Sequence, residues 1–220
     1  MYYEVKAVIF DLDGVITDTA NYHYRAWKKL AIELDIYFDK TINESLKGVS
    51  RLASLEVILK NSKRLFSNEE KNMLAARKND YYRKLIETIT PVDIYPGVLN
   101  VFKTLKEKSI KIGLASVSKN AFTVIDKLKI RKYFDYIVDA AKIKNSKPDP
   151  EIFLNAAENL NINAKNCVGI EDSSAGIKAI KAAAMYAVGI GNSELLKDAD
   201  IVLKSLVDFN INNLSIKPAL

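Results

Sequence analysis

Short apolar runs recur along the chain, separated by longer segments in which apolar residues return with a helical period. The runs rarely alternate between apolar and polar positions, which is typical of strands buried on both faces of a parallel sheet. They cover residues 5–10, 111–115, 136–140, 167–170 and 187–190, with an expected edge strand at 201–203. Helical patterns lie between them at residues 98–108, 121–128, 151–160 and 175–184. This alternation predicts a doubly wound α/β core with a parallel sheet.

Only helical patterns occupy residues 17–93. They lie at residues 24–34, 52–60 and 68–89. Ser67 and Glu70, three residues apart at the start of the third pattern, predict a capping box. We therefore predict an all-α cap over residues 17–93, inserted in a core made of residues 1–16 and 94–220.

The connections between cap and core are expected at residues 17–21 and 89–96. A cap that closes through such hinges would exclude water, which would otherwise capture a reactive phosphoryl group. The tail from residue 205 is weakly patterned, and we expect it to fray.

The tetrapeptide Asp11-Leu12-Asp13-Gly14 directly follows the first apolar run. It places two carboxylates at the carboxyl end of a buried strand, where open α/β sheets bind their ligands. Buried carboxylates need a proton or a cation, and a hard divalent ion such as Mg2+ prefers oxygen ligands. Asp11 could then be a nucleophile that becomes an aspartyl-phosphate, while Asp13 carries the proton. Taken alone, the tetrapeptide fits an ordinary Asp/Gly turn equally well.

Three later segments bring further polar groups. Ser116 and the pair Glu171-Asp172 each follow an apolar run, and Lys147 lies between them in the chain. A hydroxyl at a helix start can bind phosphate, a lysine can neutralise a phosphoryl group, and acids can complete a metal site. Each also has an ordinary interpretation: a helix cap, a surface lysine or acids in a first helical turn. Their occurrence together, in this order, favours phosphoryl transfer.

These residues resemble the haloacid dehalogenase (HAD) superfamily of phosphotransferases. The resemblance rests on Asp11, Asp13, Ser116, Lys147, Glu171 and Asp172, which span most of the chain. A narrower similarity, to members that isomerise sugar phosphates, is carried by His23 and by residues 11–19, 47–51, 116–120 and 171–177. Val117 departs from that pattern, in which a smaller residue is expected. The resemblance implies a HAD-like core with a helical cap.

The resemblance implies catalytic roles for six residues. Asp11 is expected to be the phosphorylated nucleophile and Asp13 the general acid/base. The other expected catalytic residues are Thr19, His23, Ser116 and Lys147. His23 is the only histidine, and its place in the motif favours a role in orienting Asp13 over an ordinary packed or surface position. The expected Mg2+ ligands are Asp11, Asp13 through its backbone carbonyl, Asp172 and Glu171, the last acting either on the ion or behind it.

A substrate and a reaction are implied as well. β-D-Glucose 1-phosphate and glucose 6-phosphate would be interconverted through an aspartyl-phosphate and β-glucose 1,6-bisphosphate, which serves as activator and intermediate. Arg51 would clamp the phosphate that is not being transferred, because its planar fork binds two phosphate oxygens. The expected substrate-binding residues are Lys47, Gly48, Val49, Ser50, Arg51, Ser54, Lys78, Ser116, Val117, Ser118, Lys119 and Asn120.

Two other functions stay open at this point. A sugar-phosphate phosphatase would use the same Asp11 chemistry with water as the acceptor. A non-catalytic binding or regulatory protein would keep only the fold, and the intact set of Asp11, Asp13, Lys147 and Asp172 argues against it.

Composition changes this picture little. The net charge is +6, but only six of the 33 cationic residues are arginine and acids lie among the lysines, so we expect no nucleic-acid partner. No apolar stretch approaches the ~20 residues of a membrane helix, and we expect no membrane partner. Cys167 is the only cysteine, in an apolar strand where a buried, unreactive thiol is expected, and its isolation fits a reducing compartment. We expect a monomeric cytoplasmic enzyme that binds small sugar phosphates.

Overall fold

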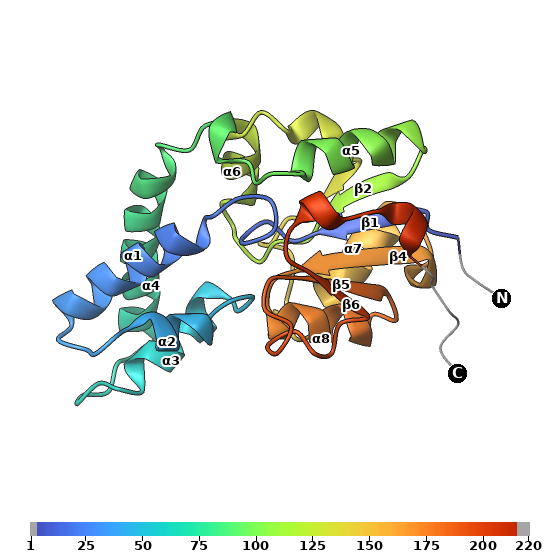
Figure 1. The fold of residues 1–220 in the computed structure, drawn as a ribbon. Helices are drawn as coiled ribbons and strands as arrows, with labels where there is room; N and C mark the ends of the chain where they lie inside the picture. Colours follow the sequence, from blue (N-terminus) through green and yellow to red (C-terminus); the bar gives the residue numbers. More distant parts are fainter. Residues whose placement is uncertain (1–3, 215–220) are drawn as a thin grey trace.

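The computed structural model describes residues 4–214, whose strands form one six-stranded parallel sheet. The strand order is β3-β2-β1-β4-β5-β6 (Figure 1). The strands are β1 (Ala7–Phe10), β2 (Lys111–Leu114), β3 (Tyr136–Ile137), β4 (Cys167–Glu171), β5 (Tyr186–Ile190) and β6 (Ile201–Leu203). The predicted parallel α/β fold is confirmed. The third strand is shorter than expected, because only two of its residues pair with β2.

The register of the central strands brings their carboxyl ends to one level. Phe10, at the end of β1, is paired with Leu114 of β2 and Ile170 of β4. Asp11 and Glu171 therefore leave the sheet side by side at the same edge. This is the edge at which open α/β sheets bind ligands.

Helices cover both faces of the sheet. The helices α5 (Val98–Glu107) and α6 (Ala121–Lys127) pack on one face, where Phe102 and Val124 are fully buried. The helices α7 (Glu151–Asn159) and α8 (Ser174–Ala182) pack on the other, with Phe153 and Ile180 in a second buried cluster. Short 3-10 turns lie at Pro91–Asp93, Arg131–Tyr133, Ala164–Asn166, Leu206–Asp208 and Ile211–Asn213.

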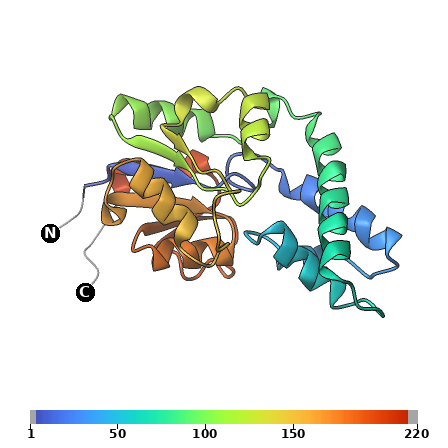
Figure 2. The same ribbon diagram turned by 180° about the vertical axis from the view of Figure 1, so that it is seen from behind.

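Four helices form a separate body beside the sheet (Figures 1 and 2). They are α1 (Ala20–Glu33), α2 (Lys40–Glu44), α3 (Arg51–Leu59) and α4 (Asn68–Ile86). These helices enclose an apolar cluster of their own, which includes Trp27, Leu30, Phe38, Leu55 and Leu74. All four fall inside the predicted insertion, while the division at residues 17 and 93 stays a prediction. We call these helices and their connections the cap.

The ends of the cap helices differ from the sequence pattern. The helix α1 starts at Ala20 rather than at residue 24, and α4 ends at Ile86 rather than at residue 89. The short helix α2 was not predicted; it starts where the Asp39 side chain accepts a hydrogen bond from the Ile42 N–H. Five residues are too few to show a helical period. The predicted capping box of Ser67 and Glu70 is confirmed.

Two chain segments connect the cap to the sheet, and they pair with each other. The Tyr95 N–H donates to the Ile16 carbonyl at 2.9 Å, and the Thr17 hydroxyl donates to the Asp93 carbonyl at 2.8 Å. Both connections therefore leave the core at one point.

The expectation of a frayed tail from residue 205 is wrong as far as residue 214. Leu206 and Ile211 are buried in the same cluster as α5, and the Leu206–Val207 backbone packs against Gly97 at the start of that helix. Tertiary contacts stabilise this segment although its sequence has no helix or strand period. The rest of the predicted tail, residues 215–220, lies outside the described residues.

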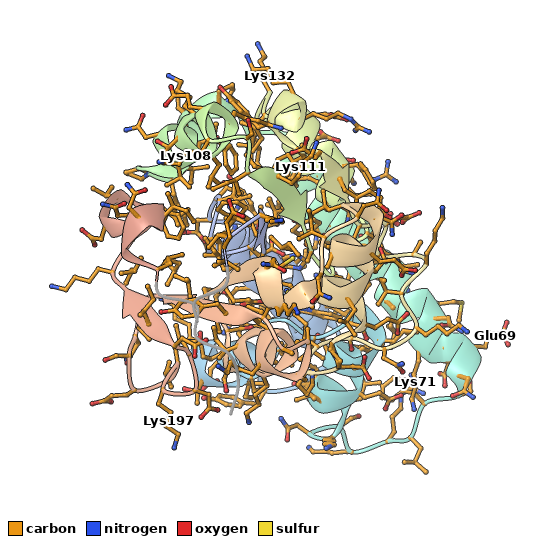
Figure 3. The ribbon with its side chains drawn as sticks, turned by 90° about the vertical axis from the view of Figure 1, so that its right-hand side faces the viewer. Glu69, Lys71, Lys108, Lys111, Lys132 and Lys197 are labelled. Atoms are coloured by element: carbon orange, nitrogen blue, oxygen red, sulfur yellow. The ribbon has the colours of Figure 1, made fainter. Side chains whose placement is uncertain are left out.

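The surface lysines do not gather in one place. Figure 3 shows labelled lysines that extend outward from different parts of the molecule, among them Lys71 on α4, Lys111 on β2 and Lys197 between β5 and β6. Several are paired with acids, such as Lys71 with Glu56 at 2.8 Å. Within residues 4–214, none of the helices is both long and apolar enough to cross a membrane.

Candidate active site

A buried lysine joins two carboxylates at the carboxyl edge of the sheet. Lys147 Nζ lies 2.6 Å from Asp11 Oδ1 and 2.6 Å from Glu171 Oε1. Burial disfavours the Lys147 ammonium, but the two carboxylates outweigh it and raise its pKa. Burial raises the pKa of Asp11, against the attraction of Lys147. The ammonium therefore stays charged beside the proposed nucleophile.

The ordinary interpretations of three motifs do not hold. The Lys147 side chain is fully buried, so it is no surface lysine. Glu171 is the last residue of β4, and the first turn of α8 contains no acid. Ser116 does not cap α6, which begins after Asn120; instead its Oγ accepts a hydrogen bond from the Ser118 N–H at 3.1 Å. Lys147 and Glu171 therefore meet Asp11 at the carboxyl edge of the sheet, while Ser116 shapes the loop that follows β2.

Three carboxylates are close enough to share a cation. One oxygen from each of Asp11, Glu171 and Asp172 lies within 4.8 Å of the others. Burial and the neighbouring Glu171 raise the pKa of Asp172 to about 7. Gly14, with φ +84°, leaves room for the Asp172 side chain, which a Cβ at that position would displace. Buried acids that repel each other in this way fit a divalent cation with oxygen ligands.

The three acids are not equally free to bind an ion. Both oxygens of Glu171 are already engaged, Oε1 by Lys147 and Oε2 by the N–H and hydroxyl of Ser173 at 2.7 and 2.9 Å. Within residues 4–214, the one donor to Asp172 is the Lys47 ammonium of the cap. Asp11 is also engaged at both oxygens, Oδ1 by Lys147 and Oδ2 by the Asp13 N–H. Asp172 is thus the most available oxygen donor of the three, while Asp11 and Glu171 are held by their neighbours.

Asp13 lies between the core and the cap. Its backbone N–H donates to Asp11 Oδ2 at 3.0 Å, which fixes the spacing of the two acids. Burial raises the pKa of Asp13 to about 6, against the attraction of Lys147 and Lys78. A carboxyl with this pKa can take up and release a proton near neutral pH.

His23 is held next to Asp13 by the cap. His23 Nε2 lies 4.0 Å from Asp13 Oδ2, and its Nδ1 lies 2.7 Å from Lys78 Nζ. Burial and the nearby Lys78 and Arg51 lower the pKa of His23, which keeps the imidazole neutral. A lysine that donates to Nδ1 leaves the proton on Nε2, directed at Asp13. The structure thus brings His23 to the residue that it was expected to orient.

Two cap cations, the buried Lys78 and the half-buried Arg51, line the pocket. Burial and Arg51 lower the pKa of Lys78 well below its usual range, and burial lowers that of Arg51. Among the described residues, neither forms an ion pair within 4.0 Å. Buried cations in this state favour an incoming anion, because an anion would offset their loss of hydration.

The cap loop of residues 47–51 reaches the core. Gly48, with φ +71°, approaches so closely that a Cβ there would lie 2.8 Å from Ser173 Oγ. Lys47 Nζ lies 3.2 Å from Asp172 Oδ2 and 2.9 Å from Glu44 Oε1. Lys47, expected as a substrate ligand, thus lies against a candidate metal ligand in this structure.

The core loop of residues 116–120 faces the cap. Ser118 Oγ accepts from the Asn120 N–H at 3.3 Å, and the Asn120 amide donates to Asn79 Oδ1 on α4 at 2.9 Å. Asn120 therefore connects core and cap directly, rather than pointing freely into the pocket.

A cavity of about 430 Å³ lies between cap and core. Most predicted site residues line it: Asp11, Asp13, His23, Lys47, Gly48, Val49, Ser50, Arg51, Ser54, Lys78, Val117, Ser118, Lys119 and Asp172. Thr19, Ser116, Lys147 and Glu171 are buried and do not line the cavity, and neither does the half-buried Asn120. The volume suits a small polar ligand such as a sugar phosphate.

Two aromatic residues at this site were missed from the sequence. Trp27 lies under the Lys78 ammonium, with Nζ 4.5 Å from the ring centroid. Tyr82 stacks on His23 with ring centroids 4.0 Å apart. Each aromatic residue follows a predicted site residue by four positions on its helix, Trp27 after His23 and Tyr82 after Lys78. That i,i+4 spacing was the available signal.

The lone cysteine lies away from this chemistry. Cys167 is buried at the start of β4, and burial raises the pKa of its thiol to about 12. The expectation of a buried, unreactive thiol is confirmed.

Known proteins resemble this chain along nearly its whole length. β-Phosphoglucomutase of Bacillus subtilis is 48% identical over 209 residues, which cover 94% of this chain and 92% of that protein. A phosphorylated-carbohydrates phosphatase of Thermotoga maritima is 30% identical, with 91% of each chain covered. The crystal structure of β-phosphoglucomutase from Clostridium difficile superposes with a TM-score of 0.92 at 53% identity, covering 94% of each chain. The family model for haloacid dehalogenase-like hydrolases matches residues 5–184, and the chain belongs to this family.

Proposed function

We propose that this protein is a β-phosphoglucomutase, which interconverts β-D-glucose 1-phosphate and glucose 6-phosphate. Two relatives that bear this name share about half of its residues over more than nine-tenths of the chain. The observation that carries the proposal is the pair of cationic positions on opposite sides of one cavity. Lys147 is bonded to Asp11 on the core side, and Arg51 and Lys78 lie on the cap side. A mutase must hold two phosphates, whereas a simple phosphatase needs to hold one.

In this proposal the core performs the phosphoryl transfer. An Asp11 carboxylate oxygen attacks phosphorus, the bond from phosphorus to the sugar oxygen breaks, and an aspartyl-phosphate forms. Lys147 and the Ser116 loop stabilise the charge on the phosphoryl oxygens. The buried position of Lys147 makes this interaction strong, because little water screens it.

The candidate metal site would be filled by Mg2+. Asp11, the Asp13 backbone carbonyl and Asp172 would hold the ion, with Glu171 positioned by Lys147 and Ser173 to act directly or from behind. When bound, Mg2+ offsets the charge shared by these carboxylates and the phosphoryl group.

Asp13 would move the proton. It accepts the proton of the sugar hydroxyl that attacks the aspartyl-phosphate, and in the reverse direction it protonates the leaving sugar oxygen. A pKa of about 6 suits both directions. His23, Lys78 and Thr19 would hold Asp13 in place when the cap is closed.

The cap would hold the phosphate that is not being transferred. Arg51 supplies a planar fork for it, and Ser118, Lys119 and Asn120 approach from the core side. β-Glucose 1,6-bisphosphate formed at Asp11 would then turn end over end, so that its other phosphate meets Asp11. The residues 17–93 would act as the cap that closes over each half-reaction.

A coupled assay tests the proposal. Glucose 6-phosphate formed from β-D-glucose 1-phosphate is measured with and without β-glucose 1,6-bisphosphate, while inorganic phosphate is measured in parallel. We expect isomerised product in large excess over phosphate, and a shorter lag with the bisphosphate. Free phosphate as the main product would instead establish the phosphatase alternative. A phosphatase that is 30% identical to this chain is the reason to test for it.

A further inference from the structure

Four buried polar side-chain atoms converge where the cap meets the core. In residues 4–214, the buried side-chain atoms without a hydrogen-bond partner are Asp13 Oδ1, Thr19 Oγ1, His23 Nε2 and the Tyr82 hydroxyl. Thr19 lies one turn before His23 on α1, where its carbonyl accepts from the His23 N–H at 3.0 Å. His23 reaches Asp13 at 4.0 Å and stacks on Tyr82 at 4.0 Å. All four atoms thus belong to one cluster.

An unpartnered buried polar group destabilises a protein by about 1–3 kcal/mol. Four of them at one point in the fold therefore indicate groups that find partners in another state of the molecule. Three of the atoms can donate a proton and the fourth, on Asp13, can accept one. The four atoms are complementary in chemistry and lie near one another, but none of them makes a well-formed hydrogen bond.

Tyr82 has no role in the function proposed above. It comes from α4, is fully buried, and packs in the main core cluster although it belongs to the cap. Burial and the charge of Asp13 raise the pKa of Tyr82, while the nearby hydroxyls of Ser118 and Thr19 oppose that rise. The phenol thus keeps its proton, between a hydroxyl of the core and a hydroxyl of the hinge.

We propose that Tyr82 is a positioning residue for the general acid/base. Its ring fixes the plane of His23, and its hydroxyl, together with Thr19, completes the set of donors around Asp13 when bound substrate draws the cap shut. Asp13 is then held for proton transfer only in the closed state. This inference rests on the proposed function.

The test is Tyr82→Phe, which keeps the stacked ring and removes one oxygen. We expect kcat for isomerisation to fall about tenfold, because small errors in placing a catalytic group are costly. KM for β-D-glucose 1-phosphate should change less than about twofold, and the acid limb of the pH–rate profile should shift. Phosphorylation of Asp11 by acetyl phosphate should keep its rate, because that leaving group needs no proton from Asp13.

Two measurements separate positioning from simple stability. Tm of Tyr82→Phe should equal or exceed that of the parent, since an unpartnered hydroxyl is removed. His23 is the only histidine in the chain. Its 15N signals therefore cannot be confused with those of another imidazole, and they report its tautomer directly. We expect those signals to shift in Tyr82→Phe complexed with substrate. The control Tyr81→Phe, on the exposed side of the same helix, should change neither kcat nor the spectrum.

An unchanged kcat in Tyr82→Phe would overturn the inference. A lower kcat accompanied by a lower Tm would overturn it as well. A parent enzyme that releases only phosphate would instead refute the proposed function itself, so the two failures can be told apart.

Discussion

The core and the cap supply charge to the site in opposite ways. On the core side, Lys147 is bonded to two carboxylates at 2.6 Å each, so its ammonium stays charged. On the cap side, burial lowers the pKa of both Arg51 and Lys78, and no acid within the described residues pairs with either. The core is arranged for a reaction at a fixed point, whereas the cap is arranged to receive an anion.

This difference assigns the energetic roles of the two regions. Core charges that are paired before substrate arrives can stabilise the transition state without reorganising. Cap cations that lack an ion-pair partner gain one only when substrate binds, so their binding energy is available to drive closure. Variants on the two sides should therefore fail in different ways.

The largest effect is expected on the core side, at the nucleophile. Asp11→Asn should reduce isomerisation by a factor on the order of 10⁴–10⁶, as removal of a nucleophile does elsewhere, because an amide does not attack phosphorus. Circular dichroism should show an intact fold. Asp126→Asn, at an exposed ion pair on α6, is the control and should keep parental activity. Substantial turnover by Asp11→Asn with Mg2+ present would remove Asp11 from its role.

A cap variant should affect the two half-reactions differently. Arg51→Ala should lower transfer to glucose 1-phosphate by about 2–5 kcal/mol, the loss typical of one partner of a buried charge pair. Phosphorylation of Asp11 by acetyl phosphate should continue, and more of the aspartyl-phosphate should pass to water. Product ratios and single-turnover rates measure both effects.

Two further variants make the Arg51 test more specific. Arg51→Lys should recover only part of the loss, because a point charge does not reproduce the planar fork. Arg77→Ala, an exposed arginine on α4, should have no effect. If Arg51→Ala slowed both half-reactions equally, the proposed difference in role between the core and cap charges would be wrong.

The metal site should respond to Asp172. Asp172→Asn should weaken Mg2+ binding about 10- to 100-fold, with partial recovery of activity at high Mg2+. Isothermal titration with Mg2+ measures the change directly. If Asp172→Asn bound Mg2+ as tightly as the parent does, Asp172 would not be a ligand of the ion.

The same residue should control how stability depends on pH when Mg2+ is removed. The pKa of Asp172 is about 7 in the folded protein and 3.8 when unperturbed. A raised pKa gives stability that is fully present below 3.8 and lost as pH rises through about 7. Above that pH, Asp172→Asn should be more stable than the parent by about 2–4 kcal/mol, and near pH 4 the two should agree. Urea unfolding in EDTA tests this, and an Asp172→Asn variant less stable at pH 8 would contradict it.

The smallest effect concerns the charge pair between Lys47 of the cap and Asp172 of the candidate metal site. Lys47 competes for Asp172 at 3.2 Å. Lys47→Met should therefore tighten Mg2+ binding about two- to fivefold, equivalent to the ~0.5–1 kcal/mol of a partly exposed pair. Lys71→Met, at a lysine of similar exposure that is paired with Glu56 elsewhere in the cap, should leave Mg2+ binding unchanged. Weaker binding in Lys47→Met would mean that this lysine supports the ion instead.

The sequence by itself determined the core side. Apolar runs of strand length that alternate with helical patterns are typical of a buried parallel sheet, and the polar residues after them then lie at its carboxyl edge. Asp11 and Glu171 therefore follow from local pattern. The helical insertion follows as well, because no strand signal interrupts residues 17–93.

The contacts and charge states of the cap residues could be known only from the tertiary structure. Within the described residues, Arg51 and Lys78 form no ion pair, which no pattern along the chain predicts. The contact of Lys47 with Asp172 and the place of Tyr82 on His23 both join residues far apart in the chain. Burial also decides whether a lysine is a surface charge or a buried one: Lys147 and Lys78 look alike in sequence, yet their pKa values move in opposite directions. Neighbours in space cause this difference, and a periodic pattern along one chain contains no information about them.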